Sequence, residues 1–145
     1  LDWEKLKRLI GIDYGTRRIG IAICDPLRII ASARQTVPNS PAFFVTLEKM
    51  ISDDDVEAIV VGMPYNLKGE KSTKALEVEE FIEQIKQHCR IEVIEWDERW
   101  TSATAHETQI MMGVKKKDRQ NKSKIDEMAA ALILQSYLDS HPNSK

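Results

Sequence analysis

The apolar run EAIVVGMP at residues 57–64 is the feature that most constrains the fold. It is rich in β-branched residues and lacks the regular alternation of a strand with one wet face, which is typical of a central strand buried on both faces. Such a strand is stable only when other elements cover both of its sides, because its apolar surface must leave water. The sequence therefore predicts a sheet that lies between two layers of helices.

The segments before this run predict an antiparallel part of the sheet. Residues 6–13 and 18–24 are short apolar runs separated by YGTR, in which Gly15 supplies turn chemistry. Together they predict a β-hairpin, and residues 28–37 are expected to add a third antiparallel strand. A helix is predicted after them, at about residues 42–52.

The segments after the run alternate between helix and strand. Apolar residues recur at helical spacing from Ala75 to Ile85, and residues 91–96 (IEVIEW) form the next predicted strand. Two more helices are predicted, at about residues 101–112 and 124–138. This order predicts an α/β protein with a mixed sheet and helices on both faces. We expect one domain over residues 1–145, with a core at about 6–138.

Composition limits the classes of function. The chain has 145 residues, of which 42% are hydrophobic and 30% charged, as in ordinary globular proteins. Its net charge of −2 argues against nucleic-acid binding by bulk electrostatics, so any such binding must be local. No segment resembles a membrane span or a signal peptide, and neither the two cysteines nor the three histidines have zinc-ligand spacing. We therefore expect a cytoplasmic protein that contacts no membrane.

Acidic residues stand where several of the predicted elements begin or end. Asp13 closes the first strand, Asp97 and Glu98 follow IEVIEW, and Asp126 lies near the start of the last helix. If the two strands are neighbours, their carboxylates converge at one edge of the sheet, where they cannot all stay ionised without a cation. Mg²⁺, or Mn²⁺ in its place, suits such oxygen ligands. Two such ions would activate water and stabilise the leaving oxygen of a phosphodiester, which is the chemistry of a nuclease.

Asp126 also has a purely structural interpretation. Ser123 and Asp126 form the pattern S-x-x-D of a capping box, in which the acid bonds back to the start of the helix. On a helical projection, however, Asp126 shares a side with Ile133 and Tyr137, whereas Glu127 is expected to point away from the buried surface. An acid beside buried surface needs a partner.

The other acids differ in how easily structure alone explains them. Asp97 and Glu98 could cap the helix that follows them or pair with Arg99, and strand alternation leaves open which of the two is the ligand. Asp13 is harder to explain, because strands disfavour aspartate and no residue in the turn obviously needs it. It is therefore the strongest candidate for a functional acid.

The stretch GIDYGTRRIG at residues 11–20 is similar to the phosphate-binding hairpin of the sugar-kinase, actin and chaperone ATPases. Those proteins use two lobes with a second phosphate hairpin and an adenosine motif. A chain of 145 residues is too short for both lobes. An ATPase would therefore need a missing half or a partner, and this remains the lesser alternative.

Four blocks of sequence, taken together, resemble the YqgF family, also called RuvX-like Holliday junction resolvases or pre-16S rRNA processing nucleases. They are IGIDYGTRRIGIAICD, VVGMPYNLKG, EWDERWTSATA and KSKIDEMAAALILQSYL, at residues 10–25, 60–69, 95–105 and 122–138. The blocks occur in the family's order over nearly the whole chain. The resemblance implies an RNase H-like fold with a mixed five-stranded sheet. It also implies a metal-dependent nuclease whose carboxylates map onto Asp13, the Asp97–Glu98 block and Asp126.

Basic and polar residues near these acids are candidates for binding nucleic acid. A basic stretch precedes the last helix, and its position beside Asp126 favours contacts with phosphates over a merely solvated loop. The full set of candidates is Arg17, Arg18, Asn66, Lys68, Arg99, Lys115, Lys116, Lys117, Arg119 and Lys122. Trp100 stands where the family usually has a smaller aliphatic residue, either as a core anchor or as a stacking platform for a base.

The expected substrate follows from the resemblance alone. The family's tie to rRNA maturation favours RNA, specifically the 5′ end of pre-16S rRNA and with it a pre-ribosomal particle. Branched DNA is the alternative, and a resolvase of four-way junctions would require a two-fold dimer. The sequence leaves monomer and homodimer both open. A third hypothesis is a non-catalytic RNA- or ribosome-binding module, from which metal-dependent cleavage would distinguish an enzyme.

Overall fold

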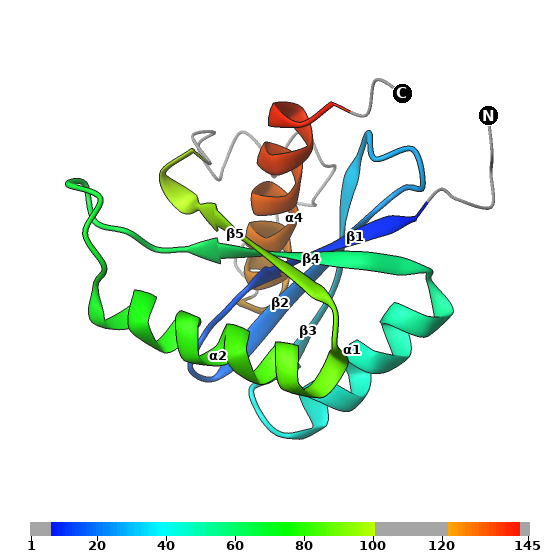
Figure 1. The fold of residues 1–145 in the computed structure, drawn as a ribbon, viewed down its shortest axis with the longest axis horizontal. Coiled ribbons are helices and arrows are strands. Elements are labelled where there is room, and N and C mark those ends of the chain that lie inside the picture. The colour runs from blue at the N-terminus through cyan, green and yellow to red at the C-terminus, as the bar shows by residue number, and fades with distance from the viewer. Residues whose placement is uncertain (1–6, 101–121, 143–145) are drawn as a thin grey trace.

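A computed structural model describes residues 7–100 and 122–142 of the chain (Figure 1). The strands are β1 (Arg8–Asp13), β2 (Arg18–Cys24), β3 (Ala31–Pro38), β4 (Val56–Met63) and β5 (Glu92–Asp97). The helices are α1 (Ala42–Asp53), α2 (Thr73–Cys89), the short 3-10 helix η2 (Glu98–Trp100) and α4 (Lys122–Ser140). These elements confirm the predicted α/β class. The helix predicted at about 101–112 lies outside the described residues.

The five strands form one mixed sheet in the order β3-β2-β1-β4-β5. β2 is antiparallel to both β1 and β3, whereas β4 is parallel to both β1 and β5. Because parallel neighbours run in the same direction, β1, β4 and β5 all end at the same edge of the sheet. The residues that follow these three strands therefore come together in space.

The third strand starts later than the sequence predicts. It begins at Ala31, because the residues before it form a turn around Asp25. The Asp25 carboxylate accepts hydrogen bonds from the backbone N–H groups of Leu27, Ile29 and Ile30, at 3.1, 2.8 and 2.7 Å. An aspartate that bonds to its own downstream backbone offers the chain an alternative to strand pairing.

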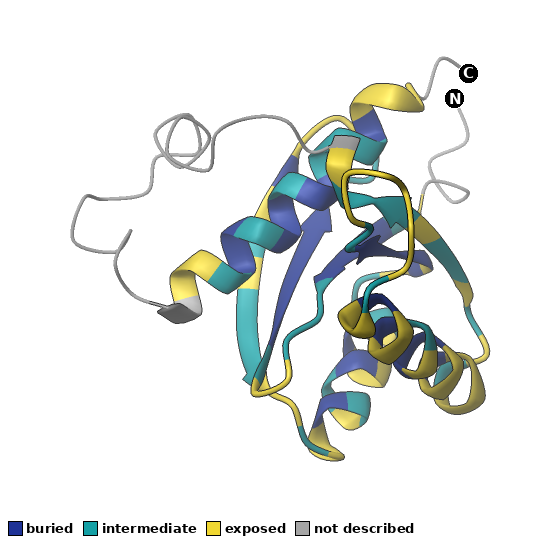
Figure 2. Ribbon diagram, turned by 90° about the vertical axis from the view of Figure 1, so that its left-hand side faces the viewer, coloured by how far each residue is buried: buried dark blue, intermediate teal, exposed yellow. Residues whose placement is uncertain are grey.

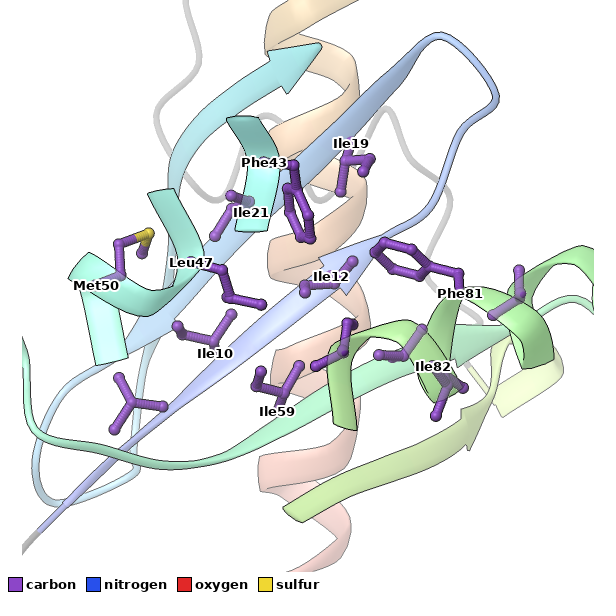
Figure 3. Close-up of a cluster of buried hydrophobic side chains, with 14 of the residues drawn as sticks. Ile10, Ile12, Ile19, Ile21, Phe43, Leu47, Met50, Ile59, Phe81 and Ile82 are labelled. Carbon is purple, nitrogen blue, oxygen red and sulfur yellow. The ribbon is translucent and has the colours of Figure 1, made fainter. Parts of the chain in front are cut away.

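One face of the sheet carries α1 and α2, with large side chains between the layers (Figure 3). Ile10 and Ile12 of β1 point to this face and are fully buried. They meet Phe43 and Leu47 of α1, together with the apolar side of α2, whose buried residues are Ala75, Val78, Phe81, Ile82 and Ile85. This layer is the larger part of the hydrophobic core.

The other face carries only α4 among the described residues (Figure 2). Its core is built from smaller groups, including Ala22 and Ala58 on the sheet and Ala130 and Ala131 on the helix. The helix face toward the strands is buried, as Figure 2 shows in dark blue. Helices therefore cover both faces, as the apolar run in β4 predicts. No helix within the described ranges is long and apolar enough to cross a bilayer.

Candidate active site

Asp13 is the last residue of β1 and lies where the sheet ends. Leu9 packs in the α4 layer, and a Cβ placed on Gly11 would touch α4, so strand alternation directs Asp13 to that same face. The carboxyl group is half-buried. Burial, followed by the negative charge of Glu98, raises the pKa of Asp13 to about 7. A strand that ends on an acid thus holds a carboxyl group that is readily protonated at neutral pH.

Glu98 is the acid that faces Asp13. It follows β5 in η2, and the side chains of Glu98 and Asp13 share a hydrogen bond. Its Oε1 lies 2.6 Å from the point that a Cβ on Gly62 of β4 would occupy. Burial raises the pKa of Glu98, although the bond with Asp13 works in the opposite direction. When two carboxyl groups share a hydrogen bond in a partly buried place, ionising both of them costs free energy.

Asp97 turns away from this pair and binds Arg99. Its carboxylate accepts hydrogen bonds from the Arg99 backbone N–H at 2.9 Å and from the guanidinium Nε at 2.9 and 3.0 Å. The side-chain bond to Arg99 holds the pKa of Asp97 below its ordinary value. Arg99 also lies over the ring of Tyr65, 5.8 Å from its centroid. Of the two adjacent acids, Glu98 is therefore the one beside Asp13, and the pairing with Arg99 that the sequence allowed is observed for Asp97. Which of the two binds a metal ion stays a prediction.

Asp126 approaches the same edge from α4 and has an arginine partner. The Arg18 Nε lies 2.8 Å from Asp126 Oδ2, and the charge of Asp126 contributes to the raised pKa of Asp13. The side chain of Ser123, the other member of the predicted capping box, lies outside what the structure describes, so the capping box stays a prediction. Arg18 of β2 thus supplies the partner that an acid beside buried surface requires.

The orientation predicted for Glu127 is wrong. Glu127 is only 8% exposed, more buried than its neighbour Asp126. The helix packs with Glu127, Ala130, Ala131 and Leu134 toward the sheet, a stripe turned by one residue from the predicted one. The Glu127 carboxylate lies 3.3 Å from Lys124 Nζ and accepts a hydrogen bond from Thr36 Oγ1 at 3.5 Å, which compensates its burial.

Three glycines bring α4 close to the sheet, and the sequence analysis missed their role. A Cβ on Gly20 would lie 2.0 Å from the carbonyl oxygen of Asp126, and one on Gly11 would lie 2.8 Å from that of Ala130. Gly62 makes room for Glu98 in the same way. The available signal was a glycine inside three apolar strands, because glycine in a strand marks close approach of another backbone.

Lys74 is a further residue that the sequence analysis missed. It lies in the first turn of α2, and its positive charge lowers the pKa of both Asp13 and Glu98. Its side chain is exposed. Nothing in the local sequence pattern distinguishes it from Lys86, the other lysine of this helix.

The residues predicted to bind nucleic acid divide into three groups. Arg17 and Lys68 are exposed. Arg18 and Arg99 are engaged by Asp126 and Asp97, while the Asn66 side-chain oxygen accepts bonds from the backbone N–H groups of Lys68 and Glu70, both at 2.9 Å. Four further candidates lie outside the described residues: Lys115, Lys116, Lys117 and Arg119. The structure describes only the backbone of Lys122, the last candidate, and it does not describe the side chain of Trp100.

The carboxyl groups at this edge are a pair with a third acid nearby. Within residues 7–100 and 122–142, no three acids, histidines or cysteines converge tightly enough to enclose a metal ion. Asp13 and Glu98 do provide two adjoining carboxyl groups, and Mg²⁺ is usually held by one or two carboxylates plus substrate phosphates. The donor set therefore fits one hard divalent cation, and Asp126 would have to exchange Arg18 for a cation to join it.

The chain is similar to known proteins along nearly its whole length. A family model described as "RuvX: Holliday junction resolvase" matches residues 7–140. A Bacteroides fragilis protein named "Putative pre-16S rRNA nuclease" is 40% identical over 136 residues, which cover 92% of this chain and 97% of that protein. A protein of the same name from Acetivibrio thermocellus is 41% identical over 137 residues, covering 92% and 96%.

Solved structures show the same fold at low sequence identity. Thermus thermophilus RuvC in complex with a Holliday junction substrate has a TM-score of 0.61 and 16% identity, over 93% of this chain and 96% of that one. The fowlpox virus Holliday junction resolvase has a TM-score of 0.56 and 13% identity, over 92% and 99%. The RNase H-like fold implied by the four sequence blocks is thereby confirmed.

Proposed function

Because the chain belongs to the RuvX family of Holliday junction resolvases, we propose that it is a metal-dependent nuclease that cleaves phosphodiester bonds in the 5′ extension of pre-16S rRNA. Its matches to bacterial proteins named as pre-16S rRNA nucleases favour RNA as the substrate. This substrate would place the protein in the cytoplasm, with a pre-ribosomal particle as its partner.

The observation that carries the proposal is the hydrogen-bonded pair of Asp13 and Glu98. The strands that lead to these acids, β1 and β5, are not neighbours as the sequence analysis supposed, because β4 lies between them. The two acids nevertheless meet across the end of β4, and they cost stability when both are ionised, so stability alone does not explain their placement. A divalent cation would replace the shared proton and remove that cost. Asp13 and Glu98 would hold Mg²⁺ or Mn²⁺, which polarises a phosphate and lowers the pKa of bound water.

The other acids of the predicted site take different roles in this proposal. Asp126 would complete a two-metal site only after leaving Arg18, which a substrate phosphate could attract in its place. Asp97 would position Arg99 rather than bind metal, because its carboxylate is already occupied by the guanidinium. We propose that Arg17, Lys68 and the basic residues at 115–122 contact the phosphates of the bound strand.

A second candidate function is the resolution of four-way DNA junctions, which the description of the matching family favours. A resolvase must cut two strands symmetrically, so it would act as a two-fold dimer. Cleavage of a synthetic junction, measured beside RNA cleavage with the same preparation, distinguishes the two substrates.

The decisive test is cleavage of end-labelled RNA with a pre-rRNA-like 5′ extension in Mg²⁺, in Mn²⁺ and in excess chelator. We expect the native protein to cut only with metal, and Asp13→Asn and Glu98→Gln to lose at least about 100-fold in rate, because each removes a ligand charge. Asp139→Asn, an exposed acid on α4, is the matched control and should cut normally.

The outcomes separate the hypotheses. Binding of RNA without cleavage by the native protein, on RNA and on junction DNA alike, would favour a non-catalytic binding module. Full activity of Glu98→Gln with loss in Asp97→Asn would reverse the assignment of the two neighbouring acids. Replacement of Lys115 to Lys117 by alanine should reduce the salt dependence of RNA affinity. An unchanged slope of log affinity against log salt concentration would show that these lysines do not contact the RNA.

A further inference from the structure

The start of α2 is fixed at the same edge of the sheet as the Asp13–Glu98 pair. The Ser72 hydroxyl accepts a hydrogen bond from the backbone N–H of Ala75 at 3.2 Å and donates one to the carbonyl of Pro64 at 3.1 Å. Pro64 directly follows β4, whose Gly62 makes room for Glu98. The cap therefore ties the first turn of α2 to the end of the strand beside the acids.

Lys74 lies on the side of α2 that faces this edge. Residues four and seven positions further along, Val78 and Phe81, share its side of the helix and are 1% and 4% exposed. The ring of Phe81 lies 4.6 Å from that of Tyr14, the residue after Asp13, and Figure 3 shows Phe81 at the end of β1 beside Ile12. Lys74 lies on the same side of the helix as Val78 and Phe81, about 10 Å before Phe81 along the helix axis.

Lys74 also differs from nearby lysines in its pairing. Lys71 lies 3.0 Å from Glu79, and Lys86 lies 3.6 Å from Glu83. Among the described residues no carboxylate lies within ion-pair distance of the Lys74 ammonium, which is exposed. Its charge nevertheless acts on both Asp13 and Glu98. The Lys74 ammonium is therefore exposed, unpaired with a described carboxylate and close enough to both acids for its charge to act on them, so it is available to a ligand.

We propose that Lys74 binds a non-bridging oxygen of the phosphate that lies against the Asp13–Glu98 pair. The inference rests on the proposed nuclease function and adds a substrate-binding residue to it. A phosphodiester brought to two acids meets like charge, and a lysine ammonium beside them offsets that repulsion as a point charge. An ammonium aimed at the phosphate also stabilises the negative charge that its oxygens carry during cleavage.

The alternative is that Lys74 only moderates the charge of the acids when no metal is bound. In that case its removal would change neither the affinity for RNA nor the rate of cleavage once metal is present. The two roles therefore differ in measurable ways.

The experiment compares Lys74→Ala and Lys74→Arg with Lys71→Ala, a matched control just before the helix whose ammonium is occupied by Glu79. Single-turnover cleavage of the end-labelled RNA in Mg²⁺ should fall about 10- to 100-fold in Lys74→Ala and recover in part in Lys74→Arg. Lys71→Ala should cut at the native rate. Thermal unfolding of each variant checks that the fold is kept.

A second readout does not depend on turnover. RNA affinity is measured against salt concentration in the Asp13→Asn background, with and without Lys74→Ala. Loss of one phosphate contact should reduce the slope of log affinity against log salt by about 0.7 for a single strand. An unchanged slope together with an unchanged cleavage rate would overturn the inference and leave the nuclease proposal standing. Absence of cleavage by the native protein would instead defeat the proposed function, and the slope would still decide the role of Lys74.

Discussion

The two faces of the sheet are built from different kinds of residue. The face under α1 and α2 is filled with large groups such as Ile10, Phe43 and Leu47, whereas the face under α4 has glycine or alanine at many contacts. Large groups bury more apolar area, so the first face supplies most of the hydrophobic stabilisation. Small groups let two backbones approach, so the second face determines where Asp126 lies. Stability and the geometry of the candidate site thus depend on opposite sides of one sheet.

The comparison predicts that damage to the face under α1 and α2, which is built from large residues, lowers stability without altering cleavage. Phe43→Ala should lower the free energy of unfolding by about 3–5 kcal/mol, because Phe43 is 1% exposed and its removal leaves a cavity. Cleavage per folded molecule should stay native at a temperature where the variant is folded. Urea unfolding measures the first quantity and single-turnover cleavage the second. A loss below about 1 kcal/mol would mean that this layer can collapse to fill the gap.

Damage to the face under α4, which is built from small residues, should reduce cleavage as well as stability. Gly20→Ala places a methyl group where the Asp126 carbonyl lies 2.0 Å away, so the start of α4 must move. We expect a loss of about 1–3 kcal/mol in stability and at least a tenfold loss in cleavage. Ile21→Val, the neighbouring residue on the other face, is the control and should cost about 1 kcal/mol with normal cleavage. Equal cleavage by both variants would refute a positioning role for the glycine.

Asp13→Asn should stabilise the metal-free protein, which sharpens the contrast between function and stability at this edge. The pKa of Asp13 is raised from 3.8 to about 7, so its ionised form is disfavoured in the folded state. The resulting penalty is absent below pH 4, grows as the pH rises toward 7 and is complete above it. In chelator at pH 8 the asparagine variant should gain about 1–3 kcal/mol. Unfolding curves from pH 4 to pH 8 test this, and parallel curves for both proteins would contradict the raised pKa.

The smallest expected effect concerns a polar tie between α4 and the turn before β3. The Gln135 amide donates to the Ile29 carbonyl at 3.0 Å and accepts from the Ala31 N–H at 2.8 Å. Gln135→Ala should cost about 1 kcal/mol, the usual net value of such bonds, and leave cleavage unchanged. Chemical denaturation is the measurement. A tenfold loss of cleavage would show that this distant tie also helps to place Asp126.

Local patterns predicted the fold well because the apolar runs were clearly bounded. The apolar runs and turn chemistry of the first hairpin, the unbroken apolar run of β4 and the helical spacing from Ala75 to Ile85 together predicted a mixed sheet covered on two sides. Asp13 stood out for a physical reason, since strands disfavour an acid unless something at their end requires it.

The details of the site depended on tertiary contacts that no local pattern contains. Asp97 and Glu98 are adjacent, and only the turn into η2 directs one to Arg99 and the other to Asp13. Glu127 was misassigned because the helical projection could not include the approach that Gly20 allows to α4. Lys74 was missed because its importance comes from where the Ser72 cap places α2.

The position of α4 in the chain has a consequence for biosynthesis. α4 is the last described helix, yet it packs against β1, β2 and β3, which are made first. The hairpin that carries Asp13 can pair as soon as it leaves the ribosome, since its contacts are local, whereas Asp126 joins it only after α4 has emerged. A growing chain would therefore hold an incomplete set of acids until α4 emerges from the ribosome, whose RNA we propose the finished protein helps to mature.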